Sequence, residues 1–169
     1  MADQTFGILG LGTIGKKVAQ IAVAMGMNTI AYSRNPVRDN MEGVTFVDRN
    51  TVFSNSDILS LHVPLTDETR SLVNKETLAL MKPSAILINT ARGQIINDTD
   101  LAEALNTNVI KAALLDVLSS EPPPENHPLI KLENCYITPH QAWASKAARQ
   151  RLLQGLVANI EGYLSLIHI

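Results

Sequence analysis

The sequence has little of several features that would assign it to particular classes of protein. Its one cysteine, Cys135, excludes an internal disulfide and fits a reducing cytoplasm. The formal net charge is −2 and no basic stripe is present, which argues against a nucleic-acid partner. No apolar run reaches membrane-spanning length, and the N-terminus lacks the layout of a signal peptide. We therefore expect a cytoplasmic protein with no nucleic-acid or membrane partner.

Short apolar runs alternate along the chain with stretches of helical periodicity. Several of these runs are apolar throughout, which is typical of parallel strands covered on both faces. A length of 169 residues fits one domain with a substantial core. We predict a single α/β domain over residues 1–169, with a Rossmann-type, doubly wound parallel sheet in three layers. The expected strands are Thr5–Leu9, Asn28–Tyr32, Val44–Val47, Ile58–His62, Ala85–Asn89, Ala112–Asp116 and Cys135–Ile137. The expected helices are Ile14–Met25, Arg49–Ser54, Lys75–Met81, Thr99–Asn106 with Asp98 as its cap, and Ser145–Leu164.

A glycine-rich turn, Gly10-Leu11-Gly12-Thr13-Ile14-Gly15, lies between the first expected strand and the first expected helix. In such a turn the first glycine permits the sharp bend, the second lets the backbone approach a pyrophosphate, and the third lets helix and strand pack together. The helix N-terminus then offers unpaired N–H groups and a partial positive charge to the phosphates. A tight turn without a ligand is the alternative, but the strand–turn–helix context favours a dinucleotide site.

Chemically distinctive residues follow most of the expected strands. In a doubly wound sheet, ligands bind beyond the carboxyl ends of the strands, so an arginine, a glutamate and a histidine are expected at one edge. The segments that follow the strands are Ser33-Arg34, His62–Thr66, Asn89–Gly93, Asp116–Pro122 and Thr138–Trp143.

These segments together resemble the D-2-hydroxyacid dehydrogenase family, and in particular its bacterial glycerate dehydrogenases, or hydroxypyruvate reductases. The resemblance covers almost the whole chain. It implies an oxidoreductase that uses a nicotinamide cofactor to reduce a 2-keto acid to a D-2-hydroxy acid, here hydroxypyruvate to D-glycerate. Phosphoglycerate, glyoxylate and lactate enzymes share the motifs, so the keto acid stays open. The segments in the family's order and spacing are Gly10–Gly15, His62–Thr66, Ile88–Gly93, Leu115–Pro122 and Thr138–Trp143.

The resemblance implies a catalytic trio of Arg92, Glu121 and His140. Arg92 would hold the substrate carboxylate by two parallel bonds and polarise the adjacent carbonyl. His140 would donate a proton to the carbonyl oxygen as hydride reaches the carbon. Glu121 would orient the imidazole and raise its pKa through the nearby opposite charge. Without the family context, each of the three is as readily a structural or solvated residue.

The other three histidines are expected to have no catalytic role. His62 is expected to pack or to bond the backbone near the cofactor, His127 lies in a proline-rich loop, and His168 lies in the tail. No spacing of cysteine, histidine and carboxylate residues indicates a metal site, so we predict none.

The resemblance also implies a set of cofactor contacts. Backbone N–H groups of the turn would bind the pyrophosphate, and Asp116 would accept from the nicotinamide carboxamide unless it merely caps a loop. Val63 and Pro64 would flank the adenine, and Thr90 and Ala91 would lie near the nicotinamide ribose. The full set is Gly10, Gly12, Thr13, Ile14, Gly15, Ser33, Arg34, Val63, Pro64, Thr90, Ala91, Arg92, Asp116, His140 and Ala142.

The choice between NAD and NADP depends on the end of the second expected strand. Ser33 stands where an NAD-selective site carries Asp or Glu for the ribose hydroxyls. Without that carboxylate, repulsion of a 2′-phosphate disappears and Arg34 is able to bind it, which favours NADPH. Alternatively, Arg34 stacks on the adenine and NADH is preferred. The ratio of kcat/KM values for the two cofactors decides between them.

Family members also place a substrate-binding domain before the glycine turn, whereas nine residues precede Gly10 here. We therefore expect a cofactor domain alone, without the N-terminal substrate-binding domain. Such a chain is expected to bind cofactor with little turnover, because fixing donor and ketone in one geometry is worth roughly 7–11 kcal/mol. The family dimerises largely through this domain, so we expect a homodimer.

Two other classes of function stay open. One is a non-catalytic dinucleotide sensor or corepressor, since a corepressor branch resembles the family and retains the trio. Partner-binding assays with and without cofactor distinguish it from an enzyme. The other is a different enzyme on the same sheet, such as a methyltransferase, which the trio in its motifs argues against.

Overall fold

The computed structural model describes residues 2–35 and 40–167. The chain divides into two units, Met1–Thr138 and Pro139–Ile169, and each is described by itself. That residues 1–169 form one cofactor-binding domain stays a prediction. His168, which the sequence places in the tail, lies outside the described residues.

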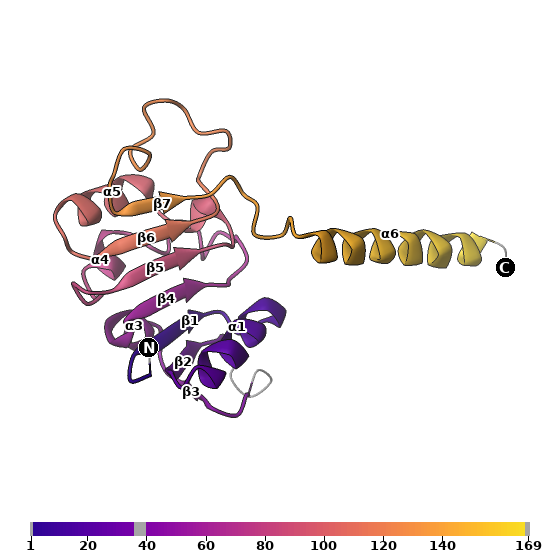
Figure 1. Cartoon of the computed structure of the whole chain (residues 1–169), viewed down its shortest axis with the longest axis horizontal. Coiled ribbons are helices and arrows are strands. Elements are labelled where there is room, and N and C mark those ends of the chain that lie inside the picture. The colour runs from indigo at the N-terminus through magenta and orange to yellow at the C-terminus, as the bar shows by residue number, and fades with distance from the viewer. Residues whose placement is uncertain (1, 36–39, 168–169) are drawn as a thin grey trace. The chain divides into compact units, whose positions relative to one another are not determined.

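The first unit is built on a seven-stranded sheet in which every pairing is parallel (Figure 1). The strand order is β3-β2-β1-β4-β5-β6-β7, so the order reverses beside β1, between β1 and β4. This doubly wound arrangement confirms the predicted fold class. The strands are β1 (Thr5–Leu9), β2 (Asn28–Tyr32), β3 (Val44–Phe46), β4 (Ile58–Leu61), β5 (Ile86–Asn89), β6 (Ala112–Leu115) and β7 (Cys135–Ile137).

The helices of the first unit follow the expected order, with small differences at their ends. α4 is shorter than predicted, and a 3₁₀ turn, η1, was not predicted. Asn97, and not Asp98, caps α5, because its side chain accepts from the backbone N–H groups of Thr99 and Asp100. The helices are α1 (Thr13–Ala24), α3 (Arg49–Asn55), α4 (Lys75–Leu78), η1 (Gly93–Ile95) and α5 (Asp98–Asn106).

Two apolar clusters show how the helices cover the sheet. Ile8 and Ala31 pack with Ala19 of α1. Leu9 and Ile30, their neighbours along the same strands, belong to a larger cluster that includes residues of α3, α4 and α5. Because successive residues of a strand point to opposite faces, α1 covers one face and α3–α5 cover the other. The predicted three layers are therefore present.

α1 covers its face of the sheet near β1 and β2, whereas the same face is exposed at β6 and β7. Ile8 lies in one row with Ser60, Ile88, Leu114 and Tyr136 through successive strand pairs. Leu114 is 40% exposed and Tyr136 is 61% exposed. Apolar surface of this kind is available for association.

A polar cluster around Asp57 lies where the strands begin, at the amino ends of the sheet. One carboxylate oxygen accepts from Lys82 Nζ and the other from the backbone N–H of Thr5, both at 2.8 Å. These hydrogen bonds lower the pKa of Asp57 below its ordinary value, and the bond from Lys82 has the largest effect. The carboxylate therefore stabilises the folded state most when it is ionised.

We expect Asp57→Asn to lower the free energy of unfolding by about 1–2 kcal/mol at neutral pH, because it removes a charged partner of two donors. The folded pKa lies below the unfolded value of about 3.9, so this stability is present above that value. It is lost as the pH falls through the folded pKa. Urea unfolding of both proteins at several pH values measures the difference. A difference that stays constant down to pH 2–3 would contradict the assignment.

The second unit consists of a short segment followed by α6 (Lys146–Ile167), a helix of 22 residues. Within residues 2–35 and 40–167, no helix is both long and apolar enough to cross a membrane. The exposed large apolar side chains of α6 are Leu152, Leu153, Leu156, Val157, Ile160, Tyr163, Leu164 and Leu166.

Candidate cofactor site and catalytic residues

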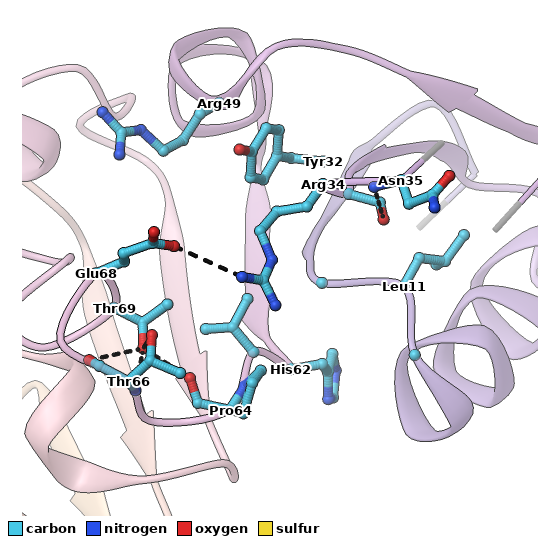
Figure 2. Close-up of a pocket in the computed structure, with 14 residues that line it drawn as sticks. Leu11, Tyr32, Arg34, Asn35, Arg49, His62, Pro64, Thr66, Glu68 and Thr69 are labelled. Atoms are coloured by element: carbon cyan, nitrogen blue, oxygen red, sulfur yellow. Dashed lines mark hydrogen bonds and ion pairs between the residues drawn. The ribbon is translucent and has the colours of Figure 1, made fainter. Parts of the chain in front are cut away.

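A pocket of about 520 Å³ opens at the carboxyl ends of β1, β2 and β4 (Figure 2). This is the side of the strand-order reversal, where ligands of doubly wound sheets bind. Six of its residues were predicted as cofactor contacts, namely Gly10, Gly12, Ser33, Arg34, Val63 and Pro64. The other lining residues are Leu11, Tyr32, Asn35, Arg49, His62, Thr66, Glu68 and Thr69.

The three glycines of the turn have different structural requirements. Gly10 has a φ of +98°, and a Cβ there would lie 2.8 Å from the carbonyl oxygen of His62. A Cβ at Gly15 would overlap the carbonyl oxygen of Gly10, so α1 packs directly on the turn. A Cβ at Gly12, in contrast, would meet no atom within 4 Å. The fold therefore requires glycine at positions 10 and 15, whereas position 12 leaves open space in front of α1.

The N-terminus of α1 lacks the side-chain cap that α3, α4 and α5 have. Side chains of Asp48, Asn74 and Asn97 accept from the first turns of α3, α4 and α5. Gly12, at the N-cap of α1, makes no such bond, and the first turn has no acidic residue. The first N–H groups of a helix have no partner within it. The Thr13 and Ile14 region therefore fits the pyrophosphate of a dinucleotide.

The rim of the pocket carries two arginines and one carboxylate. Arg34 Nη1 lies 3.5 Å from Glu68 Oε2, and Arg49 lines the same pocket. Ser33 is half-buried and its hydroxyl accepts from the backbone N–H of Asn35 at 3.2 Å. Arg34 was predicted as a contact, whereas Arg49 and Glu68 were not.

His62 lines the pocket directly after β4. Its backbone N–H donates to Leu9 O at 2.8 Å, which extends the pairing of β4 with β1 by one bond. Its Nε2 lies 2.9 Å from the hydroxyl of Ser60. Burial lowers the pKa of His62, so the neutral imidazole is favoured in the folded protein.

The loop that carries Arg92 is held by a fully buried side chain. Asn89 Nδ2 donates to Arg92 O at 2.9 Å, and Asn89 Oδ1 accepts from the Ala91 N–H at 3.0 Å. Arg92 is exposed, and its Nη1 donates to Ala91 O at 2.6 Å. Thr90 is exposed and Ala91 half-buried. The backbone of the loop is therefore fixed, while the guanidinium faces solvent.

Asp116 and Glu121 lie on the connection that follows β6. Asp116 is buried, and its Oδ1 accepts from the Thr138 hydroxyl at 2.5 Å. Glu121 is exposed, and its Oε1 accepts from the Leu118 N–H at 3.0 Å. Asp116 therefore ties the end of β6 to the end of β7, as a loop-capping residue does.

A buried histidine and a half-buried aspartate anchor the same connection to α5. His127 Nε2 lies 3.0 Å from Asp98 Oδ2, which also bonds the Ser119 hydroxyl. Gln94 Nε2 donates to Ser119 O at 2.9 Å, which links η1 to the connection. Asp98, predicted as a helix cap, instead holds this loop.

His140 and Ala142 belong to the second unit, and both are exposed. His140 has a φ of +49°. Its carbonyl oxygen accepts from Trp143 Nε1 at 3.0 Å. The convergence of His140 with Arg92 and Glu121 stays a prediction.

No group of three or more metal-ligating side chains occurs among the residues that the structure describes. Burial, with a smaller contribution from Asp98, raises the pKa of the Cys135 thiol to about 11. The thiol is therefore protonated near neutral pH and is not a nucleophile there.

Among the residues that were not predicted from the sequence, Asn89, Glu68 and Arg49 have the clearest roles at the site. Asn89 lies inside the Asn89–Gly93 segment, and an Asn at a strand end is a signal for a side chain that bonds the following turn. Glu68 lies two residues after the His62–Thr66 segment, so extending that segment would have included it. Arg49 has no local signal, because only the tertiary fold brings it to the pocket.

Comparison with known proteins agrees with the fold. The profile of the family described as D-isomer specific 2-hydroxyacid dehydrogenase, NAD binding domain, matches residues 1–142. A hydroxypyruvate reductase of Blautia hydrogenotrophica is 43% identical over 163 residues, which cover 95% of this chain and 50% of that protein. A glycerate dehydrogenase of Methylorubrum extorquens is 42% identical, with 98% and 51% covered. The chain therefore spans about half the length of these curated relatives.

Solved structures show the same similarity. A D-isomer specific 2-hydroxyacid dehydrogenase from Lactobacillus delbrueckii, in its NAD-complexed form, is 33% identical with a TM-score of 0.85 over 92% of this chain and 52% of that one. An acyclic imino acid reductase in complex with NADPH and D-Arg is 39% identical with a TM-score of 0.90 over 98% and 52%. The chain belongs to the D-isomer specific 2-hydroxyacid dehydrogenase family and carries its NAD-binding domain.

Proposed function

We propose that this chain provides the nicotinamide-cofactor site of an oxidoreductase that interconverts a 2-keto acid and a D-2-hydroxy acid, with hydroxypyruvate and D-glycerate as the substrate pair. The observation that carries the proposal is the uncapped N-terminus of α1, with open space in front of Gly12 at the pocket. The substrate pair is supported by the names of two relatives, hydroxypyruvate reductase and glycerate dehydrogenase.

The proposed chemistry divides among three side chains. Hydride transfer is the chemistry that a bound nicotinamide supplies. Arg92 binds the carboxylate of the keto acid through two parallel hydrogen bonds and polarises the neighbouring carbonyl. His140 donates a proton to the carbonyl oxygen, and Glu121 orients the imidazole. The buried amide of Asn89 supports this role for Arg92, because it fixes the backbone from which the guanidinium extends.

The end of β2 supports a preference for NADPH over NADH. Ser33 offers no carboxylate to repel a 2′-phosphate, and the guanidinium of Arg34 lies at the pocket. A guanidinium binds phosphate through charge-assisted hydrogen bonds. We therefore propose that Arg34 binds the 2′-phosphate of NADPH.

We also propose that the chain forms a homodimer and is located in the cytoplasm. The exposed Leu114 and Tyr136, and the exposed apolar side chains of α6, support association into a homodimer. Sedimentation analysis of the purified chain tests the dimer. A cytoplasmic location fits the single buried cysteine, Cys135.

Titration of the purified chain with NADPH and NADH, followed by an assay of NADPH oxidation with several keto acids, tests the function. We expect both cofactors to bind, NADPH more tightly, and Arg34→Gln to lower the NADPH affinity about tenfold, as the loss of a charge-assisted bond implies. Binding of neither cofactor would contradict the dinucleotide site. Tighter binding of NADH would contradict the NADPH preference. The oxidation rate of this chain is expected to be low with every keto acid, and a faster rate with a keto acid other than hydroxypyruvate would contradict the substrate pair.

A further inference from the structure

The pocket contains a carboxylate that the end of β2 does not provide. Glu68 lies in the turn after β4, and its Oε2 is 3.5 Å from Arg34 Nη1. Figure 2 shows the two side chains extending toward each other from opposite sides of the pocket. An NAD-selective site carries an acidic residue at the end of the second strand, where this chain has Ser33. The fold thus brings an acidic group to the same pocket from a different strand.

Hydrogen bonds hold the turn that carries Glu68. The Thr69 hydroxyl donates to Pro64 O at 2.6 Å, and it accepts from the Thr66 N–H at 2.8 Å. The Arg70 N–H donates to Thr66 O at 2.9 Å. These bonds close the turn on both sides of Glu68. Its carboxylate therefore extends from a fixed backbone position at the pocket.

The ion pair contributes little to the stability of the fold. The side chains of Arg34 and Glu68 are 70% and 77% exposed, and exposed pairs of this kind are worth about 0.2–1 kcal/mol. A ligand is therefore able to displace Glu68 from the guanidinium at small cost. The negative charge nevertheless stays beside whatever binds Arg34.

The two cofactors differ in what they offer to this carboxylate. A 2′-phosphate is an anion that only accepts hydrogen bonds, so it competes for Arg34 and is repelled by Glu68. A free ribose hydroxyl is neutral and donates a hydrogen bond, which a carboxylate accepts. The same residue therefore disfavours NADPH and favours NADH.

We propose that Glu68 is a specificity-determining residue for the cofactor and that it acts in opposition to Arg34. Arg34 increases the affinity for a 2′-phosphate, and Glu68 decreases it relative to the affinity for a free 2′-hydroxyl. This inference rests on the proposed use of the pocket for the adenosine half of NAD(P). The opposing charges at positions 34 and 68 together set the ratio of the two affinities.

The test is Glu68→Gln, which removes the charge and nearly keeps the shape of the side chain. The full chain is titrated calorimetrically with NADP⁺ and with NAD⁺, which differ only in the 2′-phosphate. We expect Glu68→Gln to raise the ratio of NADP⁺ to NAD⁺ affinity about fivefold at low ionic strength and less at high salt. Glu133→Gln is the matched control, because it removes an exposed carboxylate that does not line the pocket. Its ratio should equal that of the unmodified chain.

Combining Glu68→Gln with Arg34→Gln separates repulsion from competition. If Glu68 repels the phosphate directly, the charge removal still raises the ratio when Arg34 is absent. An unchanged or lowered ratio in Glu68→Gln, with both cofactors still bound, would overturn the role of Glu68 and leave the cofactor site intact. If the unmodified chain binds neither cofactor, the proposed function fails and this inference fails with it.

Discussion

Replacing Gly12 by aspartate is expected to abolish cofactor binding and to leave the chain folded. A Cβ at this position meets no atom within 4 Å, and aspartate is among the preferred N-cap residues. We therefore expect the free energy of unfolding to stay the same or to rise by about 0.5 kcal/mol. The carboxylate would occupy the space in front of α1 and repel the pyrophosphate, so affinity should fall more than about 100-fold. Calorimetric titration with NADPH and urea unfolding of the same sample measure both effects.

Two further variants separate the effect of the added negative charge from the effect of the added side-chain volume. Gly12→Asn adds a side chain of similar shape without the charge, so its loss of affinity should be smaller than that of Gly12→Asp. Gly155→Ala adds a methyl group in α6, where a Cβ also meets no atom within 4 Å, and it should leave affinity unchanged. Wild-type affinity in Gly12→Asp would show that the pyrophosphate binds elsewhere.

Gly93→Ala is expected to destabilise the first unit strongly. A Cβ at Gly93 would overlap backbone atoms of Leu118 and Ser119, and backbone cannot rotate out of the way as a side chain does. We expect the free energy of unfolding to fall by about 3 kcal/mol or more, at the upper end of the effects of overpacking. Urea unfolding measures this change, with Gly155→Ala as the control.

The Gly93→Ala variant also tests how two members of the candidate trio, Arg92 and Glu121, are positioned. Gly93 follows Arg92 directly, and the segment that it touches leads to Glu121. The close approach of the two segments therefore sets how near the loop of Arg92 lies to the connection that carries Glu121. Unchanged stability in Gly93→Ala would show that the two segments separate easily and do not position each other.

The sequence predicted the sheet well because burial on both faces leaves a local signature. All seven strands occur where short runs of strand-forming residues were noted, several of them apolar throughout, with ends that differ by at most one residue. His62 and Asp116 were assigned to strands, and their N–H groups do continue the pairing, to Leu9 O and Asn89 O. The glycine turn was equally visible, because its spacing and its flanking elements are local.

Features that depend on distant segments were not predictable in the same way. Glu68 meets Arg34 only because β4 lies two strands away from β2 across β1. Asp98 resembles a cap in sequence, but Asn97 takes that position and Asp98 bonds His127 on another connection. Such choices depend on competition between local and tertiary hydrogen bonds, which a single sequence does not resolve.

Trp143 gives the chain an internal optical reporter. It is the one tryptophan of the sequence, and its indole N–H donates to the carbonyl oxygen of His140 at 3.0 Å. When tryptophan is excited selectively, the fluorescence therefore comes from a residue three positions after His140 in the sequence. Reduced nicotinamide absorbs where tryptophan emits, so energy transfer to bound NADPH grows as this turn approaches the ring. One emission titration, with Trp143→Phe as the non-fluorescent control, thus reports whether cofactor binding brings the turn that carries His140 within energy-transfer range of the nicotinamide ring.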